Sequence, residues 1–382
     1  MQRWNDHIRP HKGFTELDKQ AHKLFYAYVI GRFEEETAEV DWNGLIEGAI
    51  FEFFHRVVLT DIKPPIFHML MEKHGGQINR LVMDRLAEAG INDIHHGFGE
   101  RMERYFFDPG YCRHEKRILS ASHYFATSWE FEIVYKLSEK FYGIEETKRN
   151  IEKEIEEHQD IDGVQKLVFS RGALDFLNLV GQLRFQQRWA QTQRVPETSV
   201  AGHMLVVAML SYMLTLGLDP CDKRKYNNFF AGLFHDMPEV LTRDIISPVK
   251  NSAAEIADLI KTIEDKQMKE KLLPLLPESW RREICYFTEN EFDDKIVEDG
   301  KIINTSTEII NEKYNRDEFS PLDGRIVEFC DKFSAYMEAY LSIKHGIISQ
   351  NLEDGYNGIY EKFRKTRIAG MNLGRLLDYF RL

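Results

Sequence analysis

Hydrophobic residues recur every three or four positions along most of the chain, which predicts helices rather than strands. One such stripe lies within residues 20–33, and residues 202–216 are apolar nearly all round, as expected for a buried central helix. Residues 254–273 and 323–344 also have helical spacing. Alternating β-branched runs bounded by tight turns are scarce. The pattern therefore predicts a mainly α fold.

The polar segments suggest how the helices are divided. Residues 145–157 are highly charged with little apolar content, so we expect a solvated helix or a connector between lobes. The sequence DPGY at 108–111 predicts a turn, and residues 291–315 predict a longer irregular region. Because 382 residues exceed the usual size of one hydrophobic core, two lobes are expected, residues 1–150 and 165–382.

Charge and cysteine usage narrow the classes of partner. The net charge of −12 is unfavourable for binding DNA, RNA or an anionic membrane. It leaves open a small phosphorylated substrate, because a bound metal can invert the local potential. The four cysteines are scattered without a CxxC pair, which favours free thiols in a reducing compartment. The longest apolar stretch, 204–218, is shorter than the roughly 20 residues of a membrane span, so we expect a cytoplasmic protein.

The two halves of the chain share a spacing of polar residues, which suggests an internal repeat. In the best register an arginine and a histidine of the first half stand where the second half has two aspartates. We interpret the first lobe as a degenerate copy of the second, although chance similarity between helical segments is the alternative. The paired positions are His22 with His203, His55 with His235, Arg56 with Asp236, His123 with Asp331 and Glu130 with Glu338.

Arg56 in particular argues against a metal in the first lobe, since a guanidinium beside two imidazoles repels a cation. We therefore expect this lobe to serve packing, homodimer formation or coverage of the site. Zinc bound by its three histidines is the alternative.

The second lobe carries two histidines and two carboxylates that could form one metal site: His203, the adjacent pair His235 and Asp236, and Asp331. A mixed nitrogen and oxygen set suits Mn, Fe, Co, Ni or Zn better than calcium, which prefers oxygen ligands alone, and Mg is a further candidate. Four protein ligands on an octahedral ion leave positions for water and a phosphate oxygen, as metal-assisted hydrolysis requires.

This arrangement resembles the HD-domain metal-dependent phosphohydrolases, whose fold is a helical bundle. The resemblance covers residues 172–340, and the motifs RW-x13-H and HDxxEVLTxDxxxPVK are similar to the bacterial 5'-deoxynucleotidase branch. It implies that the histidines and aspartates above are the metal ligands. It further implies that Glu239 and Asp244 are catalytic acids and that Arg188 and Trp189 contact a nucleotide.

Each of these residues also has a structural alternative. Glu239 and Asp244 could cap or solvate a helix, Arg188 could form a surface ion pair, and Trp189 could fill the core. Lys250 could add positive charge near the phosphate, but we favour a helix-capping role. The chain departs from the family at Gly202, before the first histidine, and in the position of Glu197.

The function that we expect is a 5'-nucleotidase that releases phosphate from nucleoside monophosphates, including the deoxy forms. A regulatory protein that binds a nucleotide without hydrolysing it is an alternative, as is hydrolysis of a triphosphate, cyclic dinucleotide or alarmone. A di-iron oxygenase is disfavoured, since the sequence has no histidine between His235 and His345.

Overall fold

The computed structural model describes residues 14–60, 62–242 and 254–382. The chain divides into two compact units, Met1–Asn178 and Leu179–Leu382. Both units consist mainly of helices, which confirms the expected fold class. None of the described helices has the length and apolar character that a membrane crossing needs. All four cysteines are free, as expected.

The first unit is built around α1, which packs against α5 and α7, while α2 also packs on α5. Thr15 caps the start of α1 by accepting a hydrogen bond from the backbone N–H of Asp18 at 3.2 Å. The boundary between the two units falls within α8. The elements are α1 (Glu16–Glu34), α2 (Trp42–Leu59), α3 (Pro64–Glu88), η1 (Ile91–Asp93), α4 (Phe98–Phe107), α5 (Arg113–Ser138), α6 (Ile144–Glu156), α7 (Asp162–Phe169) and α8 (Arg171–Gly181).

The charged segment at 145–157 forms helix α6, one of the two structures that we expected for it. Its few apolar side chains are enough to fix it to the first unit. Ile144 and Ile151 are buried against Phe131 and Val134 of α5, so α6 packs within this unit through one narrow apolar stripe.

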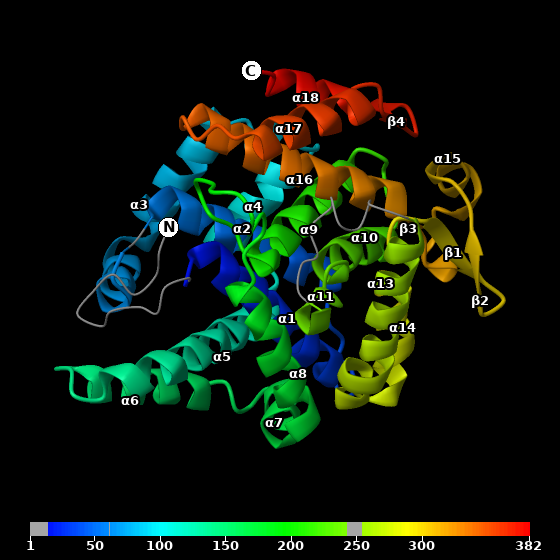
Figure 1. The fold of residues 1–382 in the computed structure, drawn as a ribbon. Coiled ribbons are helices and arrows are strands. Elements are labelled where there is room, and N and C mark those ends of the chain that lie inside the picture. Colours follow the sequence, from blue (N-terminus) through cyan, green and yellow to red (C-terminus); the bar gives the residue numbers. More distant parts are fainter. Residues whose placement is uncertain (1–13, 61, 243–253) are drawn as a thin grey trace. The chain divides into compact units, whose positions relative to one another are not determined.

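The second unit has α9 at its centre, packed against α10 and α16, and α16 in turn packs against α17. Figure 1 shows α9 and α10 in green and α16 in orange. The described elements are η2 (Gln182–Phe185), α9 (Val200–Leu216), α10 (Asp222–Phe234), α11 (Glu239–Thr242), α13 (Ala254–Gln267), η3 (Met268–Leu272), η4 (Leu273–Leu275), α14 (Glu278–Thr288), β1 (Asp294–Glu298), β2 (Lys301–Asn304), α15 (Thr307–Ile309), η5 (Ile310–Tyr314), η6 (Asp317–Phe319), β3 (Leu322–Asp323), α16 (Gly324–Lys344), α17 (Gln350–Phe363), β4 (Arg367–Ile368), β5 (Met371–Asn372) and α18 (Gly374–Tyr379).

Our prediction of an irregular region over 291–315 is wrong, because this segment contains a β-hairpin. Strands β1 and β2 pair in antiparallel fashion, and β3 adds to the other edge of β1. The turn consists of Asp299 and Gly300, both with positive φ, 49° and 73°. An Asp-Gly pair between short apolar runs is a strong hairpin signal, but the acidic and basic residues around it obscured the alternation.

Helices α9 and α10 pack closely because α10 has a glycine at their contact. A Cβ on Gly232 would lie 2.8 Å from the Cα of Ala208 on α9. Only a residue without a side chain fits at this distance. The separation of the two helices therefore depends on Gly232.

We expect Gly232→Ala to lower the free energy of unfolding by about 1–3 kcal/mol, the usual cost of overpacking a core. Thermal unfolding measured by circular dichroism tests this. Gly358→Ala on α17 is the matched control, since a Cβ there meets nothing within 4 Å, and it should be neutral or slightly stabilising. Equal melting temperatures for the two variants would contradict the close approach of α9 and α10.

Candidate metal centre

His203 lies in the first turn of α9 and is almost fully buried. Ser199 caps this helix by accepting a hydrogen bond from the N–H of Gly202 at 2.9 Å, which fixes where the histidine emerges. The ring Nδ1 lies 3.0 Å from Ser334 Oγ, and Nε2 lies 3.1 Å from Asp331 Oδ1. With Nδ1 donating to Ser334, Nε2 presents its lone pair to a metal.

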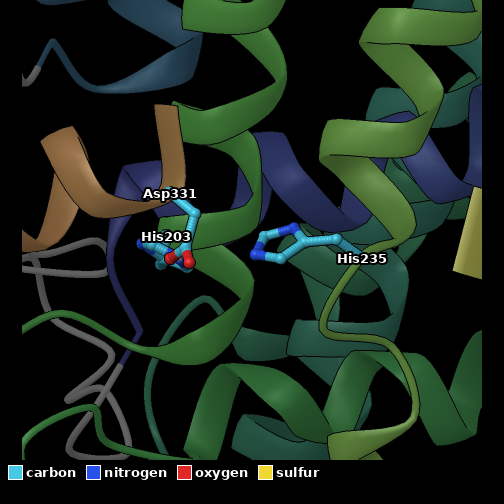
Figure 2. Close-up of side chains that lie close together, drawn as sticks. All are labelled: His203, His235 and Asp331. Carbon is cyan, nitrogen blue, oxygen red and sulfur yellow. The ribbon is translucent and has the colours of Figure 1, made fainter. Parts of the chain in front are cut away.

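His235 directly follows α10 as its C-cap residue, and a carbonyl of that helix fixes its ring orientation. Nδ1 donates a hydrogen bond to the carbonyl oxygen of Gly232 at 2.8 Å, which leaves Nε2 as the potential ligand atom. Figure 2 shows the ring pointing toward His203 and Asp331, and the two imidazole centroids are 5.4 Å apart. The three side chains thus converge from α9, α10 and α16.

The ligand atoms of His203, His235 and Asp331 lie within 4.8 Å of one another. Asp236 joins the cluster, since its Oδ2 lies 3.2 Å from His235 Nε2 and 3.7 Å from His203 Nε2. The structure therefore brings all four expected ligands together.

The pKa values in this cluster are mutually dependent. Burial lowers the pKa of His203. Burial also opposes charge on His235, but the carboxylates of Asp236 and Asp331 raise its pKa to about 9. Burial raises the pKa of Asp236, yet the two histidines and Arg188 hold it well below its usual value. Burial also raises the pKa of Asp331, but the ammonium of Lys332 and the two histidines lower it well below its usual value. Both carboxylates are thus ionised at neutral pH, and a bound metal would displace the proton that they hold on His235.

Arg188 and Trp189 are placed beside the cluster by the loop that precedes α9. The N–H of Arg188 donates to the Thr198 carbonyl at 3.0 Å, so the loop folds back on itself. Arg188 Nη1 then lies 3.4 Å from Asp236 Oδ2. Trp189 has a φ of 56°. Such a backbone is unusual for a bulky residue and typical of strained positions at functional sites.

The expected catalytic acids are only partly covered by the described residues. Glu239 is buried at the start of α11, and its N–H donates to the carbonyl of Asp236 at 3.0 Å, one turn from the metal ligands. Asp244 and Lys250 lie outside the described residues. The roles of Glu239 and Asp244 stay predictions.

Comparison with known proteins finds a family match over the part of the chain that contains this cluster. The HD domain family profile matches residues 180–360, which lie within the second unit. A 5'-deoxynucleotidase of Vibrio atlanticus is 30% identical over 135 residues, covering 34% of this chain and 69% of that protein. The chain belongs to the HD-domain phosphohydrolases. A second 5'-deoxynucleotidase, from Vibrio parahaemolyticus, is 30% identical over 139 residues with the same coverage. An Enterobacter 5'-deoxynucleotidase is 32% identical over 113 residues, 54% of its length.

The side chains of this HD domain fit a divalent cation. His235 Nε2 is buried and makes no hydrogen bond with the residues that the structure describes, although the Asp236 carboxylate is near. A buried nitrogen of this kind, facing two ionised carboxylates and a second imidazole, is suited to coordinate a metal.

The corresponding histidines of the first unit make other contacts. His22 Nε2 donates to the Leu177 carbonyl at 2.9 Å, and His55 Nε2 lies 3.0 Å from Asn79 Oδ1. The Lys19 ammonium lies 3.0 Å from His123 Nε2. These contacts do not support the zinc alternative.

Several contacts of the HD domain were not predicted from the sequence. Ser334 follows Asp331 by three residues and Glu338 follows it by seven, so all three lie on one face of α16. That spacing was a usable signal. Thr198 and Arg194 belong to a loop without regular periodicity, and no sequence pattern indicated their contacts.

Proposed function

We propose that this HD domain is a 5'-nucleotidase that releases phosphate from nucleoside 5'-monophosphates, including the deoxy forms. The main supporting observation is the convergence of His203, His235 and Asp331 within 4.8 Å. Asp236 and Arg188 lie directly beside them. Clustered metal ligands next to a guanidinium suit a phosphate ester. The relatives are named 5'-deoxynucleotidases, which supports a nucleotide as the molecule that contains this phosphate ester.

In this proposal the four side chains hold one divalent ion, which supplies Lewis-acid activation of the phosphate group when bound. Arg188 binds a phosphate oxygen through its guanidinium. Trp189 provides an apolar face for the sugar or base. Glu239 orients and deprotonates the attacking water, and Asp244 acts on that water or donates a proton to the leaving oxygen.

The metal is Mn, Co, Fe, Ni, Zn or Mg. Two imidazoles favour the transition metals over magnesium, whereas the two carboxylates suit any member of the set. The metal that restores activity to stripped protein decides among them.

We also propose that the first unit is a degenerate copy of the HD domain that contributes packing or a homodimer contact. His22, His55 and His123 lie on α1, α2 and α5, and α1 packs against α5 as α9 packs against α16. One bound ion per chain, rather than two, is the expected stoichiometry.

The test of the proposed function is phosphate release from a panel of nucleoside mono-, di- and triphosphates, cyclic dinucleotides and alarmones. Each substrate is offered to metal-stripped protein with each candidate ion added back. We expect release from the 5'-monophosphates. Release from another class alone would replace the substrate assignment. Stoichiometric metal binding with no release would favour a nucleotide-binding regulator.

A further inference from the structure

Glu338 is a buried carboxylate that contacts the loop beside the metal ligands. One oxygen, Oε2, accepts a hydrogen bond from Trp189 Nε1 at 2.9 Å and another from Arg188 Nε at 3.4 Å. The other oxygen, Oε1, accepts from the hydroxyl of Thr198 and lies 3.7 Å from Arg194 Nη2. A single side chain of α16 is therefore bonded to both residues that we expect to contact the nucleotide.

The charge of Glu338 is maintained by the two guanidinium groups. Burial raises its pKa, but Arg188 and Arg194 outweigh burial and lower the pKa to about 2. Arg194 is itself buried, and its Nε and Nη1 make no hydrogen bond with residues in the described parts of the chain. Glu338 is thus its main counter-charge, and neutralising this carboxylate would affect both arginines.

The indole of Trp189 is also confined at its far edge. A Cβ on Gly355 of α17 would lie 2.6 Å from the indole Cη2 atom. The ring therefore occupies space that only a glycine leaves open. Together with the strained backbone of Trp189, the hydrogen bond from Nε1 and the contact with Gly355 hold the indole in one place.

We propose that Glu338 is a positioning residue that holds Arg188 and Trp189 beside the metal ligands, with Gly355 leaving room for the indole. This inference rests on the proposed function, because it assigns substrate contacts to Arg188 and Trp189. Glu338 acts through these two residues and does not itself touch the substrate. It should therefore govern the affinity for the nucleotide more than the chemical step.

Glu338→Gln keeps an acceptor for Trp189 but removes the charge that anchors the arginines. We expect KM for the monophosphate to rise about tenfold, the effect of losing one charge-assisted hydrogen bond. We expect kcat to stay within about threefold, as for a loss of uniform binding, and the bound metal to stay at the wild-type level. Glu353→Gln, at an exposed position of α17, is the control and should change neither constant.

Gly355→Ala tests the same arrangement without touching a charge. It should displace the indole, shift the fluorescence of Trp189 and raise KM, whereas Gly358→Ala on the same helix should do neither. The Trp189 signal is the difference between each protein and its Trp189→Phe partner.

The two readouts separate the proposals. A wild-type protein that hydrolyses no monophosphate overturns the proposed function, while the fluorescence still reports on the indole. An unchanged Trp189 emission in both Glu338→Gln and Gly355→Ala overturns the positioning role even if the nucleotidase activity is present. A fall in kcat with unchanged KM would also overturn it, because Glu338 would then act in the chemical step.

Discussion

Asp236→Ala should abolish metal-dependent phosphate release and remove the bound ion. Asp236 lies within 4 Å of both histidines and of Arg188. Its loss therefore removes the carboxylate that the two imidazoles and the guanidinium share. Loss of a partner outside the coordination sphere typically costs 10–100-fold in metal affinity or activity. Loss of a ligand should therefore cost more than about 100-fold. Metal content measured by mass spectrometry and initial rates of phosphate release test this.

Asp222→Ala provides the matched control for this substitution. Asp222 begins α10, the helix that His235 follows, and its exposed side chain forms an ion pair with Lys225. The control should keep the ion and the rate. Retention of both by Asp236→Ala would remove this residue from the metal site.

Glu239→Gln should lower kcat by about 10²–10⁴-fold, the contribution of a general base, without loss of the metal. The side chain is buried at the start of α11, and its backbone is bonded to Asp236. Glutamine has nearly the same shape but cannot accept a proton at neutral pH. We therefore expect kcat to fall while the bound metal stays at the wild-type level. Measuring kcat and the metal content of the same protein tests this.

The exposed Glu270, which has 61% of its side-chain surface accessible, offers a control of the same chemistry. Glu270→Gln should leave kcat unchanged. If Glu239→Gln instead loses the bound ion and has a lower kcat, Glu239 positions the metal ligands and does not act on the attacking water. A wild-type kcat would assign it a purely structural role.

The parts of the fold that could be predicted were those with a single dominant pattern. Helix α9 is apolar all round and α16 has regular spacing, so both were predicted from periodicity. The hairpin of β1 and β2 was missed because the charged residues around Asp299 and Gly300 obscured a short alternation.

The candidate site could likewise be predicted only in part. The four expected metal ligands could be chosen because two are adjacent and the motifs around them are specific. The contacts of Glu338 could not be predicted, because they depend on how an irregular loop carrying Trp189 packs against α16. Contacts of this kind arise from tertiary packing, which local sequence patterns do not encode.

The first unit illustrates the limit of spacing alone. Its histidines have the sequence spacing of the second unit, but His22 is bonded to a backbone carbonyl and His123 lies beside the ammonium of Lys19. Similar spacing is thus compatible with different chemistry. Descent from a common copy stays a prediction.

The decisive measurement is a metal titration of stripped wild-type protein, with bound ion and phosphate release from a deoxynucleoside 5'-monophosphate followed together. We predict that activity rises in proportion to the bound metal and reaches its maximum at one ion per chain. Full activity without metal, or no phosphate release once one ion is bound, would contradict it.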